Sequence, residues 1–382
     1  MSRYQAVRRW VADQGSPLVH ESIPSRYATL EEAVRTLRPA QPLQAVYPAV
    51  RARQAARFRD GFPGRVIYTL AANPDPSVLQ DLRMAGITSF AAKTLAEMDG
   101  ARRESPDSAL VFTAPVKARE DIRHAWQAHG VTAFACATPE ESRKIREVTG
   151  DDPRVTLLVR GQGEGAFALA REAQAVGVRV GLSVAGDAEA ATPLAYVRDV
   201  VATWRAARAA GVSPDVMNLE GGFPRKASPE SLFACLRDAL VGACEGVEAW
   251  GMLGRSLVGD SATLVTRVEL RKGDVLHVND GTYGSLSDVA RRGAAGGAVR
   301  LIRDDARAGR KGVRGRALAP FILFGPTCDS VDKMPGPFLL PDDVQEGDWL
   351  AFTAAGAYGA SAQTRFNGFF SDAKVEITED RP

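Results

Sequence analysis

The side chains that could perform chemistry show little pattern in their spacing. The cysteines are Cys136, Cys235, Cys244 and Cys328, and the histidines are His20, His124, His129 and His277. The cysteines form no Cys-x-x-Cys pair and have no metal-type spacing to the histidines, which argues against a disulfide framework and against a zinc site. The histidines lie in terminal, helical or strand contexts without a converging motif. We interpret them as surface or core residues.

Composition bounds the class of protein. The chain has 382 residues, 45% of them hydrophobic and 25% charged, which is enough for two cores rather than one. The net charge is only +2 and the basic residues are scattered, so no nucleic acid partner is expected. No uncharged apolar run is long enough to span a bilayer or to form a signal core. We therefore expect a cytoplasmic protein with reduced cysteines and no membrane partner.

The elements that must position a site follow a βα period between residues 64 and 255, where short apolar runs alternate with amphipathic stretches of helical period. The strand candidates are Arg65–Leu70, Ser89–Lys93, Leu110–Ala114, Ala133–Ala137, Thr156–Arg160, Arg179–Val184, Val216–Leu219 and Glu248–Met252. The helix candidates include Pro76–Met84, Ala118–Ala128, Pro139–Val148, Gly165–Ala175, Ala195–Ala210 and Pro229–Val241. Eight such units predict a (β/α)8 barrel with its reactive groups at the carboxyl ends of the strands.

The sequence pattern changes after Arg255 from alternating βα units to β-rich runs. The β-rich runs, separated by Gly, Pro and Asp turns, are Ala262–Leu270, Asp274–Val278, Ala298–Ile302, Ala317–Leu323 and Asp348–Thr353. The charged stretch 304–314 is expected to be an exposed hairpin loop. We predict an α/β plus all-β chain. An N-terminal segment (1–40) packs on the β domain, a (β/α)8 barrel spans 41–255, and a C-terminal β domain spans 256–382.

Six ordered stretches resemble a known family. The strongest is Phe324–Pro341 (FGPTCDSVDKMPGPFLLP). The others are Val278–Asp288 (VNDGTYGSLSD), Gly356–Phe369 (GAYGASAQTRFNGF), Ala72–Leu82 (ANPDPSVLQDL), Ala114–Arg119 (APVKAR) and Gly221–Pro224 (GGFP). In order and spacing they resemble the ornithine/lysine (Orn/Lys/Arg/DAP) decarboxylases, which are fold-type III pyridoxal-phosphate (PLP) enzymes. The resemblance implies an alanine-racemase-like barrel before a β domain, and a two-fold dimer, whereas function must be argued at the site.

The resemblance also places the barrel's cofactor residues at positions where this chain differs. The family's Schiff-base lysine falls on Ala71, whose methyl group cannot form an imine. The family's second-strand acid falls on Ala91, its ring-stacking histidine on Ser183, and the glutamate that pairs with the pyridine nitrogen on Met252. Glu220 replaces a glycine of the phosphate-binding run and brings a negative charge near the expected dianion. A divergent member without PLP is therefore predicted.

Other positions match the family. By the resemblance, a residual phosphate or anion site would comprise Arg160, Gly221, Gly222, Arg255 and Tyr358. Cys328, Asp329 and Asp280 match β-domain residues that the family uses, together with Tyr358, for protonation, for gripping the substrate's distal amine and for the phosphate. In the family these β-domain residues complete the barrel of a dimer partner. The residues that would complete a partner's site are thus retained, whereas the cofactor residues of the chain's own barrel are replaced.

Simpler interpretations stay open for the retained residues. Cys328 follows a constrained Gly-Pro-Thr stretch and could be a small buried residue that only packs. Asp280 and Asp329 could be turn formers, because Asn279-Asp280-Gly281 is a strong turn signal.

Two lysines could alter the prediction about PLP. Lys93 has the strand parity of Ala91 and lies at the end of the second strand, so it could point into the barrel as a relocated Schiff-base lysine. A lysine at a strand end more often reaches solvent. Lys117 matches a family lysine that does not bind the cofactor, so a structural role is expected for it. PLP is then expected only non-covalently or through Lys93.

Three functions follow from this pattern. The leading hypothesis is an ornithine-decarboxylase-like protein with a degenerate PLP site, which is not a PLP decarboxylase on its own. It would be a binding or regulatory subunit in amine or polyamine metabolism, as a homodimer or as a heterodimer with a competent paralogue. The second hypothesis is a PLP-independent enzyme that binds a small anionic or amino-acid-like ligand in the emptied barrel mouth. The third is an active diamino acid decarboxylase that uses Lys93.

Overall fold

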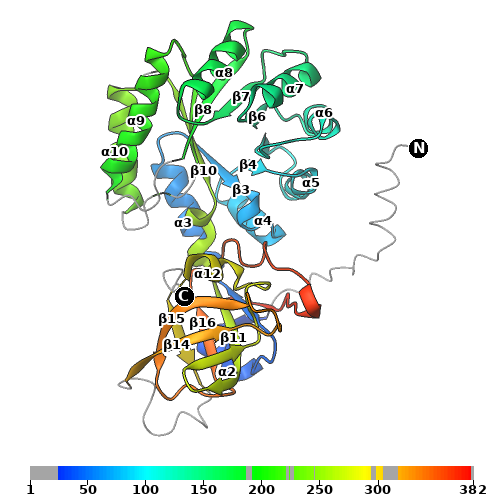
Figure 1. Cartoon of the computed structure of the whole chain (residues 1–382), viewed down its shortest axis with the longest axis vertical. Coiled ribbons are helices and arrows are strands. Elements are labelled where there is room, and N and C mark those ends of the chain that lie inside the picture. Colours follow the sequence, from blue (N-terminus) through cyan, green and yellow to red (C-terminus); the bar gives the residue numbers. More distant parts are fainter. Residues whose placement is uncertain are drawn as a thin grey trace, which may run out of the picture.

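The molecule consists of a parallel β/α barrel and a mixed β sheet, which lie one above the other along its long axis (Figure 1). The computed structural model describes residues 25–185, 192–220, 223, 228–244, 246–293, 298–303 and 317–379. The predicted fold class, a (β/α)8 barrel followed by a β domain, is confirmed. Within these described ranges, no helix is long and apolar enough to cross a membrane.

Eight parallel strands close the barrel in the order β10-β3-β4-β5-β6-β7-β8-β9. They are β3 (Arg65–Thr69), β4 (Ser89–Ala92), β5 (Ala109–Phe112), β6 (Ala133–Cys136), β7 (Thr156–Arg160), β8 (Arg179–Ala185), β9 (Val216–Glu220) and β10 (Glu248–Leu253). Each predicted strand matches one of them to within two residues at either end. An apolar cluster made of Ile67, Ala91, Val111, Ala133, Ala135, Leu158, Val216, Trp250 and Met252 is buried separately from the larger barrel core. It is the kind of layered packing that fills a barrel interior.

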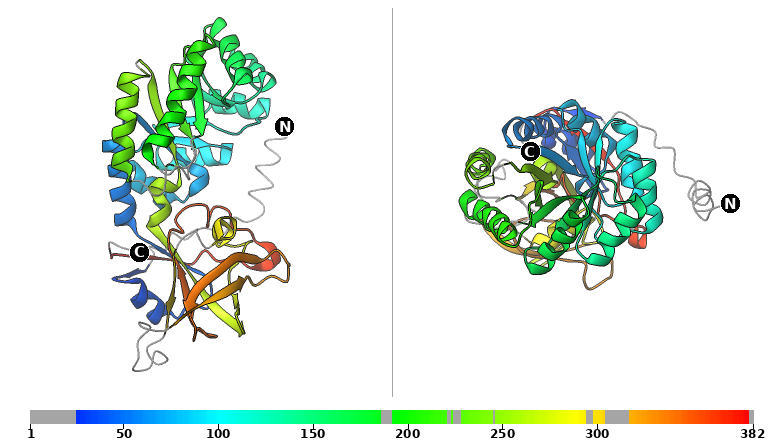
Figure 2. Two further views of the ribbon diagram at one scale, coloured as in Figure 1. Left: turned by 60° about the vertical axis from the view of Figure 1, so that its left-hand side comes forward. Right: turned by 90° about the horizontal axis from the view of Figure 1, so that it is seen from above.

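Helices surround the strands, as the view from above shows (Figure 2). They are α3 (Pro48–Gly61), α4 (Pro76–Met84), α5 (Leu95–Glu104), α6 (Arg119–Gln127), α7 (Pro139–Thr149), α8 (Glu164–Ala175), α9 (Pro193–Ala209), α10 (Pro229–Gly242) and the short α11 (Arg255–Val258). The hydroxyls of Thr94, Thr138 and Thr192 each accept a backbone N–H at a helix start. These caps end the loops that leave the carboxyl ends of the strands, where a barrel places its site.

The β domain contains a sheet of nine strands among the described residues, and its main path runs β1-β17-β2-β11-β12-β14-β15. The strands are β1 (Arg26–Tyr27), β2 (Leu43–Val46), β11 (Ala262–Lys272), β12 (Val275–Val278), β13 (Val299–Ile302), β14 (Leu318–Phe324), β15 (Lys333–Pro341), β16 (Trp349–Phe352) and β17 (Lys374–Ile377). β16 joins β11 to β13 off this path. Two helices, α2 (Leu30–Leu37) and α12 (Ser287–Arg292), also belong to this part.

The N-terminal boundary differs from the division expected at residues 40 and 41. β2 pairs with both β11 and β17, so residues 43–46 lie in the β sheet and not in the barrel. Leu30 and Val34 of α2 are buried in the same apolar cluster as Val265 and Trp349 of the sheet. The barrel part therefore begins with α3, and residues 1–24 lie outside the described residues.

β15 is a strand that the sequence did not predict. It contains Pro335, Pro337 and Pro341, and proline cannot donate to a strand ladder. β15 ends the main path of the sheet and pairs with β14, which is the edge position where prolines are tolerated. The predicted loop at 304–314 lies outside the described residues.

The loop after β16 joins the β domain to the carboxyl end of the barrel. The Gly356 N–H donates to Gly259 O at 2.9 Å, and the Asn73 side chain donates to Gly356 O at 3.1 Å. Further along the same loop, the Tyr358 N–H donates to Ala72 O at 2.7 Å. The segment that follows β3 is thereby attached to the β domain.

Gly356→Ala is expected to destabilise this junction. A Cβ at Gly356 would lie 1.9 Å from Val258 O and 3.0 Å from Gly259 O, and both of these atoms belong to the backbone. Overpacking against atoms that cannot rotate away costs roughly 2–3 kcal/mol, which urea unfolding can measure. Gly165→Ala is the matched control, because a Cβ there, in the first turn of α8, meets nothing within 4 Å. Equal unfolding midpoints for the two variants would contradict the prediction.

Candidate functional site

The turn after β3 is held closely by the β domain. η1 (Leu70–Ala72) follows β3 directly. The Ser361 hydroxyl donates to Ala71 O at 2.9 Å and to Ala72 O at 3.2 Å. Ala71 itself is half-buried. The position that the resemblance assigns to the cofactor lysine therefore carries a methyl group in a fixed turn.

The other substituted barrel positions are buried. Ala91 and Met252 belong to the apolar interior cluster and are 1% and 6% exposed. The Asn218 Nδ2 on β9 donates to Ser183 Oγ at 2.9 Å and lies 3.6 Å from Met252 Sδ. Its Oδ1 is buried and has no hydrogen-bond partner among the described residues. Asn218 was missed in the sequence, although it shares strand parity with Glu220 two residues on.

Arg160 and Glu220 form an ion pair between the ends of β7 and β9. Arg160 Nε lies 3.0 Å from Glu220 Oε2, and Glu220 Oε1 also accepts from Asn218 Nδ2 at 2.9 Å. The Arg160 and Glu220 side chains are 29% and 18% exposed. Gly221 and Gly222, which complete the predicted anion site on this side, lie outside the described residues.

Arg255, at the start of α11, is held by α12. Its Nη1 and Nη2 donate to Asp288 Oδ2 at 2.8 Å and to Asp288 Oδ1 at 2.7 Å. Asp288 also accepts from Arg292 Nε at 2.7 Å and lies 3.6 Å from Arg291. Burial alone would raise the pKa of Asp288, but the hydrogen bonds and charges of Arg255 and Arg292 lower it below its ordinary value. Asp288 was not predicted from the sequence, although its spacing of three and four residues to two arginines was a signal.

Tyr358 contacts the same arginine. The Arg255 guanidinium lies 5.1 Å from the centre of the Tyr358 ring, and burial raises the pKa of the Tyr358 phenol. Gly254 packs closely beside it: a Cβ there would lie 2.8 Å from the Tyr358 hydroxyl and 3.0 Å from the Ala72 Cβ. The predicted neighbours Arg255 and Tyr358 are thus together.

Two buried carboxyl groups organise the loops of the β domain. Asp332 is 1% exposed and accepts from the N–H and hydroxyl groups of both Thr282 and Thr327. Asp280 is 5% exposed and accepts from the Gly281 N–H at 2.6 Å. Burial raises the pKa of Asp280 to about 7. Asp332, which the sequence analysis did not single out, sits inside the strongest family-like stretch.

The loop between β14 and β15 presents the retained candidates. Cys328 is exposed, so its interpretation as a buried packing residue does not hold. The Tyr283 hydroxyl donates to Asp329 Oδ2 at 2.7 Å, and this hydrogen bond lowers the pKa of Asp329. The Tyr283 ring lies against Phe366, with 4.4 Å between ring centres. Tyr283 and Phe366 thus help to position a carboxylate next to an accessible thiol.

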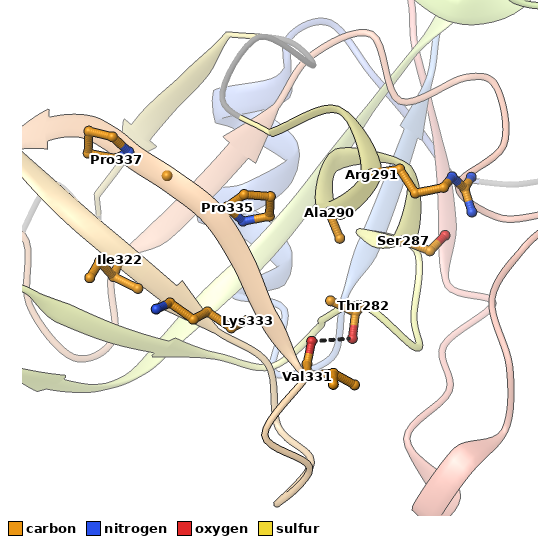
Figure 3. Close-up of a pocket in the computed structure, with 10 residues that line it drawn as sticks. Thr282, Ser287, Ala290, Arg291, Ile322, Val331, Lys333, Pro335 and Pro337 are labelled. Atoms are coloured by element: carbon orange, nitrogen blue, oxygen red, sulfur yellow. Dashed lines mark hydrogen bonds between the residues drawn. The ribbon is translucent and has the colours of Figure 1, made fainter.

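A groove of about 740 Å³ lies beside this loop (Figure 3). α12 provides one side with Ser287, Ala290 and Arg291, and β15 provides the other with Lys333 and two prolines. The Thr282 hydroxyl donates to Val331 O at the end of the groove. Val331, which lines the groove, is 63% exposed, and Leu318 on β14 and Leu339 on β15 are 62% and 58% exposed.

The two lysines considered in the sequence have different surroundings. Lys93 lies one residue beyond β4, and it is exposed. The Lys117 side chain is fully buried and donates to Ala114 O at 2.8 Å and Ala135 O at 2.6 Å. Burial lowers the pKa of Lys117, although Glu141, 2.9 Å away, partly opposes this effect. These contacts fit the structural role expected for Lys117.

The family follows from a match over most of the chain. Residues 10–356 match the family model described as "Pyridoxal-dependent decarboxylase, C-terminal sheet domain", so the chain belongs to the pyridoxal-dependent decarboxylases. The chloroplastic ornithine decarboxylase of Nicotiana glauca is 30% identical over 350 residues, covering 81% of this chain and 77% of that protein. The ornithine decarboxylase of Neurospora crassa is 26% identical over 384 residues, covering 85% and 78%. The resemblance seen in the sequence is confirmed.

Solved structures show the same fold. The lysine/ornithine decarboxylase of Vibrio vulnificus, complexed with putrescine, superposes with a TM-score of 0.73 at 25% identity, covering 92% of this chain and 99% of that one. The arginine decarboxylase of Paramecium bursaria Chlorella virus superposes with a TM-score of 0.74 at 21% identity, covering 91% and 100%. The barrel and the β domain are therefore both shared with these enzymes.

Proposed function

We propose that this chain is a decarboxylase-family subunit that does not operate PLP in its own barrel. It acts instead as a binding or regulatory partner in cytoplasmic amine metabolism, paired with itself or with a competent paralogue. The observation that supports the proposal is the difference between the chain's two half-sites, one in the barrel and one in the β domain. Ala71 stands in the turn after β3, whereas Cys328 and Asp329 lie on a loop ordered by its own hydrogen bonds. Such a loop can complete the barrel of another protomer.

The described barrel residues do not fit the cofactor that the family name implies. A pyridoxal imine needs a lysine amine at the barrel mouth. Lys117 is buried against two carbonyl groups, and Lys93 is exposed beyond the end of β4. Arg160 and Arg255, the cations expected near a phosphate, are each paired with a carboxylate of this chain. We therefore derive no step of chemistry through PLP in this barrel.

The surface around the retained loop supports contact with another chain. Cys328 is exposed, and the groove that Val331 of the same loop lines contains apolar as well as basic side chains. Val331 at the groove and Leu339 on β15 are each more than half exposed. Exposed apolar groups beside a groove are typical of protein contact sites. In this proposal, the surface is the contact site for a dimer partner.

An active decarboxylase is the second candidate, and the position of Lys93 favours it. Lys93 is the residue directly after β4, so it stands at a barrel strand end. Borohydride trapping of a PLP imine followed by peptide mapping would identify Lys93 if this candidate holds. The third candidate, an anionic ligand bound by Arg160 and Arg255, has less support because both guanidinium groups already have carboxylate partners.

The visible spectrum of the purified chain with added PLP tests the proposal. We expect no imine absorbance and no decarboxylation of ornithine, lysine or arginine by the chain alone. When the chain is mixed with a paralogue whose own β-domain cysteine and aspartate are mutated, activity should return. The same mixture should protect Cys328 from thiol reagents, since a partner's barrel would cover it.

Matched variants of this chain control the mixing experiment. Cys328→Ala combined with Asp329→Asn should abolish the rescue, whereas Cys235→Ala, a substitution on α10, should leave it unchanged. Imine absorbance or decarboxylation in the unmixed chain would overturn the proposal. Failure of every paralogue to associate, together with a monomeric chain, would also overturn it.

A further inference from the structure

We infer that Glu220 and Asp288 determine which ligands the barrel mouth accepts. Each carboxylate pairs with a guanidinium group that would otherwise bind an external anion. The barrel mouth therefore rejects ligands that carry a phosphate group and accepts ligands that carry none. The inference deepens the proposed function and rests on it, because both require that no cofactor phosphate is held in this barrel. It adds the residues responsible and the chemical class that they exclude.

The Arg255–Asp288 contact has the geometry of a strong anion complex. Two nitrogen atoms of one guanidinium group meet two oxygen atoms of one carboxylate at 2.8 and 2.7 Å. Bidentate, charge-assisted pairs of this kind are what Arg also offers to phosphate. The Asp288 side chain is only 7% exposed. The carboxylate therefore holds the position where an anionic ligand of Arg255 would bind.

Arg160 on β7 is paired with a carboxylate on β9, two strands further along the barrel. Glu220 Oε2 lies 3.0 Å from Arg160 Nε, and Glu220 Oε1 lies 3.2 Å from Arg160 Nη2. The Asn218 amide also donates to Glu220 Oε1, which fixes the carboxylate on the β9 side. Glu220 is therefore held by two side chains, Arg160 on β7 and Asn218 on β9.

A phosphate would have to displace these carboxylates to reach the guanidinium groups. A displaced Glu220 would stay partly buried without its cation, which costs several kcal/mol. A displaced Asp288 would keep its contact with Arg292 and lose the bidentate pair with Arg255. Either carboxylate would also stand within a few ångströms of the incoming dianion, and like charges repel strongly where water is scarce. By contrast, an uncharged side chain at position 288 would remove the carboxylate that Arg255 contacts through two of its nitrogen atoms. The residue at position 288 therefore determines whether the anion site at Arg255 is blocked or open.

Binding of inorganic phosphate to the full chain tests this inference. The probe is a phosphate titration followed by calorimetry and by the unfolding temperature, with chloride of equal ionic strength as reference. Wild type should bind phosphate only weakly. The double variant Glu220→Gln, Asp288→Asn should bind phosphate about tenfold or more tightly than wild type, which corresponds to about 1.4 kcal/mol. Its unfolding temperature should rise with phosphate concentration.

Asp81→Asn is the matched control. It breaks another partly buried arginine pair, in which Arg51 Nε donates to Asp81 at 2.8 Å between α3 and α4. This variant should lose stability without gaining a phosphate response. If the double variant does not fold, Asp288→Asn and Glu220→Gln are titrated singly, and each should gain part of the response.

Two results would overturn the inference. One is phosphate binding by wild type as tight as by the variants, and the other is an equal phosphate response in Asp81→Asn. Neither result bears on whether the chain forms a PLP imine, so neither would by itself overturn the proposed function. Conversely, imine absorbance in wild type would overturn the proposed function whatever the phosphate titration gives.

Discussion

Asp332→Ala is expected to lower the free energy of unfolding by about 4 kcal/mol and to release the loop that carries Cys328 and Asp329. The Asp332 carboxylate accepts four hydrogen bonds, two from Thr282 and two from Thr327. Alanine would leave two partly buried backbone N–H groups without an acceptor, and each orphaned donor costs about 1–3 kcal/mol. Urea unfolding measures the loss, and limited proteolysis between residues 327 and 332 reports the loop itself.

Two further variants make this expectation specific. Asp332→Asn keeps one of the two oxygen acceptors, so it should lose roughly half as much stability as the alanine variant. Asp342→Ala removes an exposed carboxylate in the same domain and should change stability by less than about 0.5 kcal/mol. Equal losses for Asp332→Ala and Asp342→Ala would show that other contacts hold the loop.

The barrel could be predicted because its strands and helix starts are encoded locally. β4 and β6 are short apolar runs, and each is followed within a few residues by a threonine that caps the next helix. A period of this kind needs no knowledge of distant residues, and eight repeats close a barrel by themselves. The ends of the predicted strands were therefore accurate to within two residues.

The missing parts of the sheet depend on distant partners. β2 is a four-residue strand whose partner in β11 lies at Ala262–Val265, and nothing in its own sequence indicates that pairing. β15 carries prolines that argue against a strand, and only its edge position makes them acceptable. Both strands are defined by long-range pairing, which a local pattern does not report.

The arginines of the candidate site could be predicted from the sequence, but their pairing with carboxylates could not. The resemblance located Arg160 and Arg255, and the charge of Glu220 was noticed beside the expected phosphate. Asp288 lies on a six-residue helix of the β domain, so its contact with Arg255 exists only because that domain folds back onto the barrel end. The consequence that both cations are internally paired required the three-dimensional arrangement.

The stability of the chain is expected to fall as the pH rises from about 4 to about 7 because of Asp280. Burial raises the pKa of this carboxyl group from 3.8 to about 7, with the charge of Asp332 adding to the rise and three backbone N–H groups opposing it. The folded chain therefore binds this proton more tightly than the unfolded chain does. The contribution is fully present below pH 4 and is lost by about pH 7, and a shift of this size corresponds to about 4 kcal/mol.

Asp280→Asn isolates this contribution from the other titrating groups. The stability of wild type relative to Asp280→Asn, measured by urea unfolding at several pH values, should decrease by about 4 kcal/mol between pH 4 and pH 7. Asp329→Asn is the control with the opposite sign. The Tyr283 hydroxyl lowers the pKa of Asp329, so its contribution is present above the ordinary pKa and is lost only at lower pH. Above pH 4.5, the free energy of unfolding of Asp329→Asn should change with pH in parallel with that of wild type.

The outcome decides between two interpretations of Asp280. A falling difference would mean that the group is largely protonated below pH 7, and a neutral carboxyl group cannot attract a substrate ammonium by charge. Asp280 would then be a residue that shapes its own turn, in which a Cβ on Gly284 would lie 1.9 Å from Asp280 Oδ1. Parallel profiles for wild type and Asp280→Asn would instead show an ionised carboxylate, as a role in gripping a cationic ligand requires.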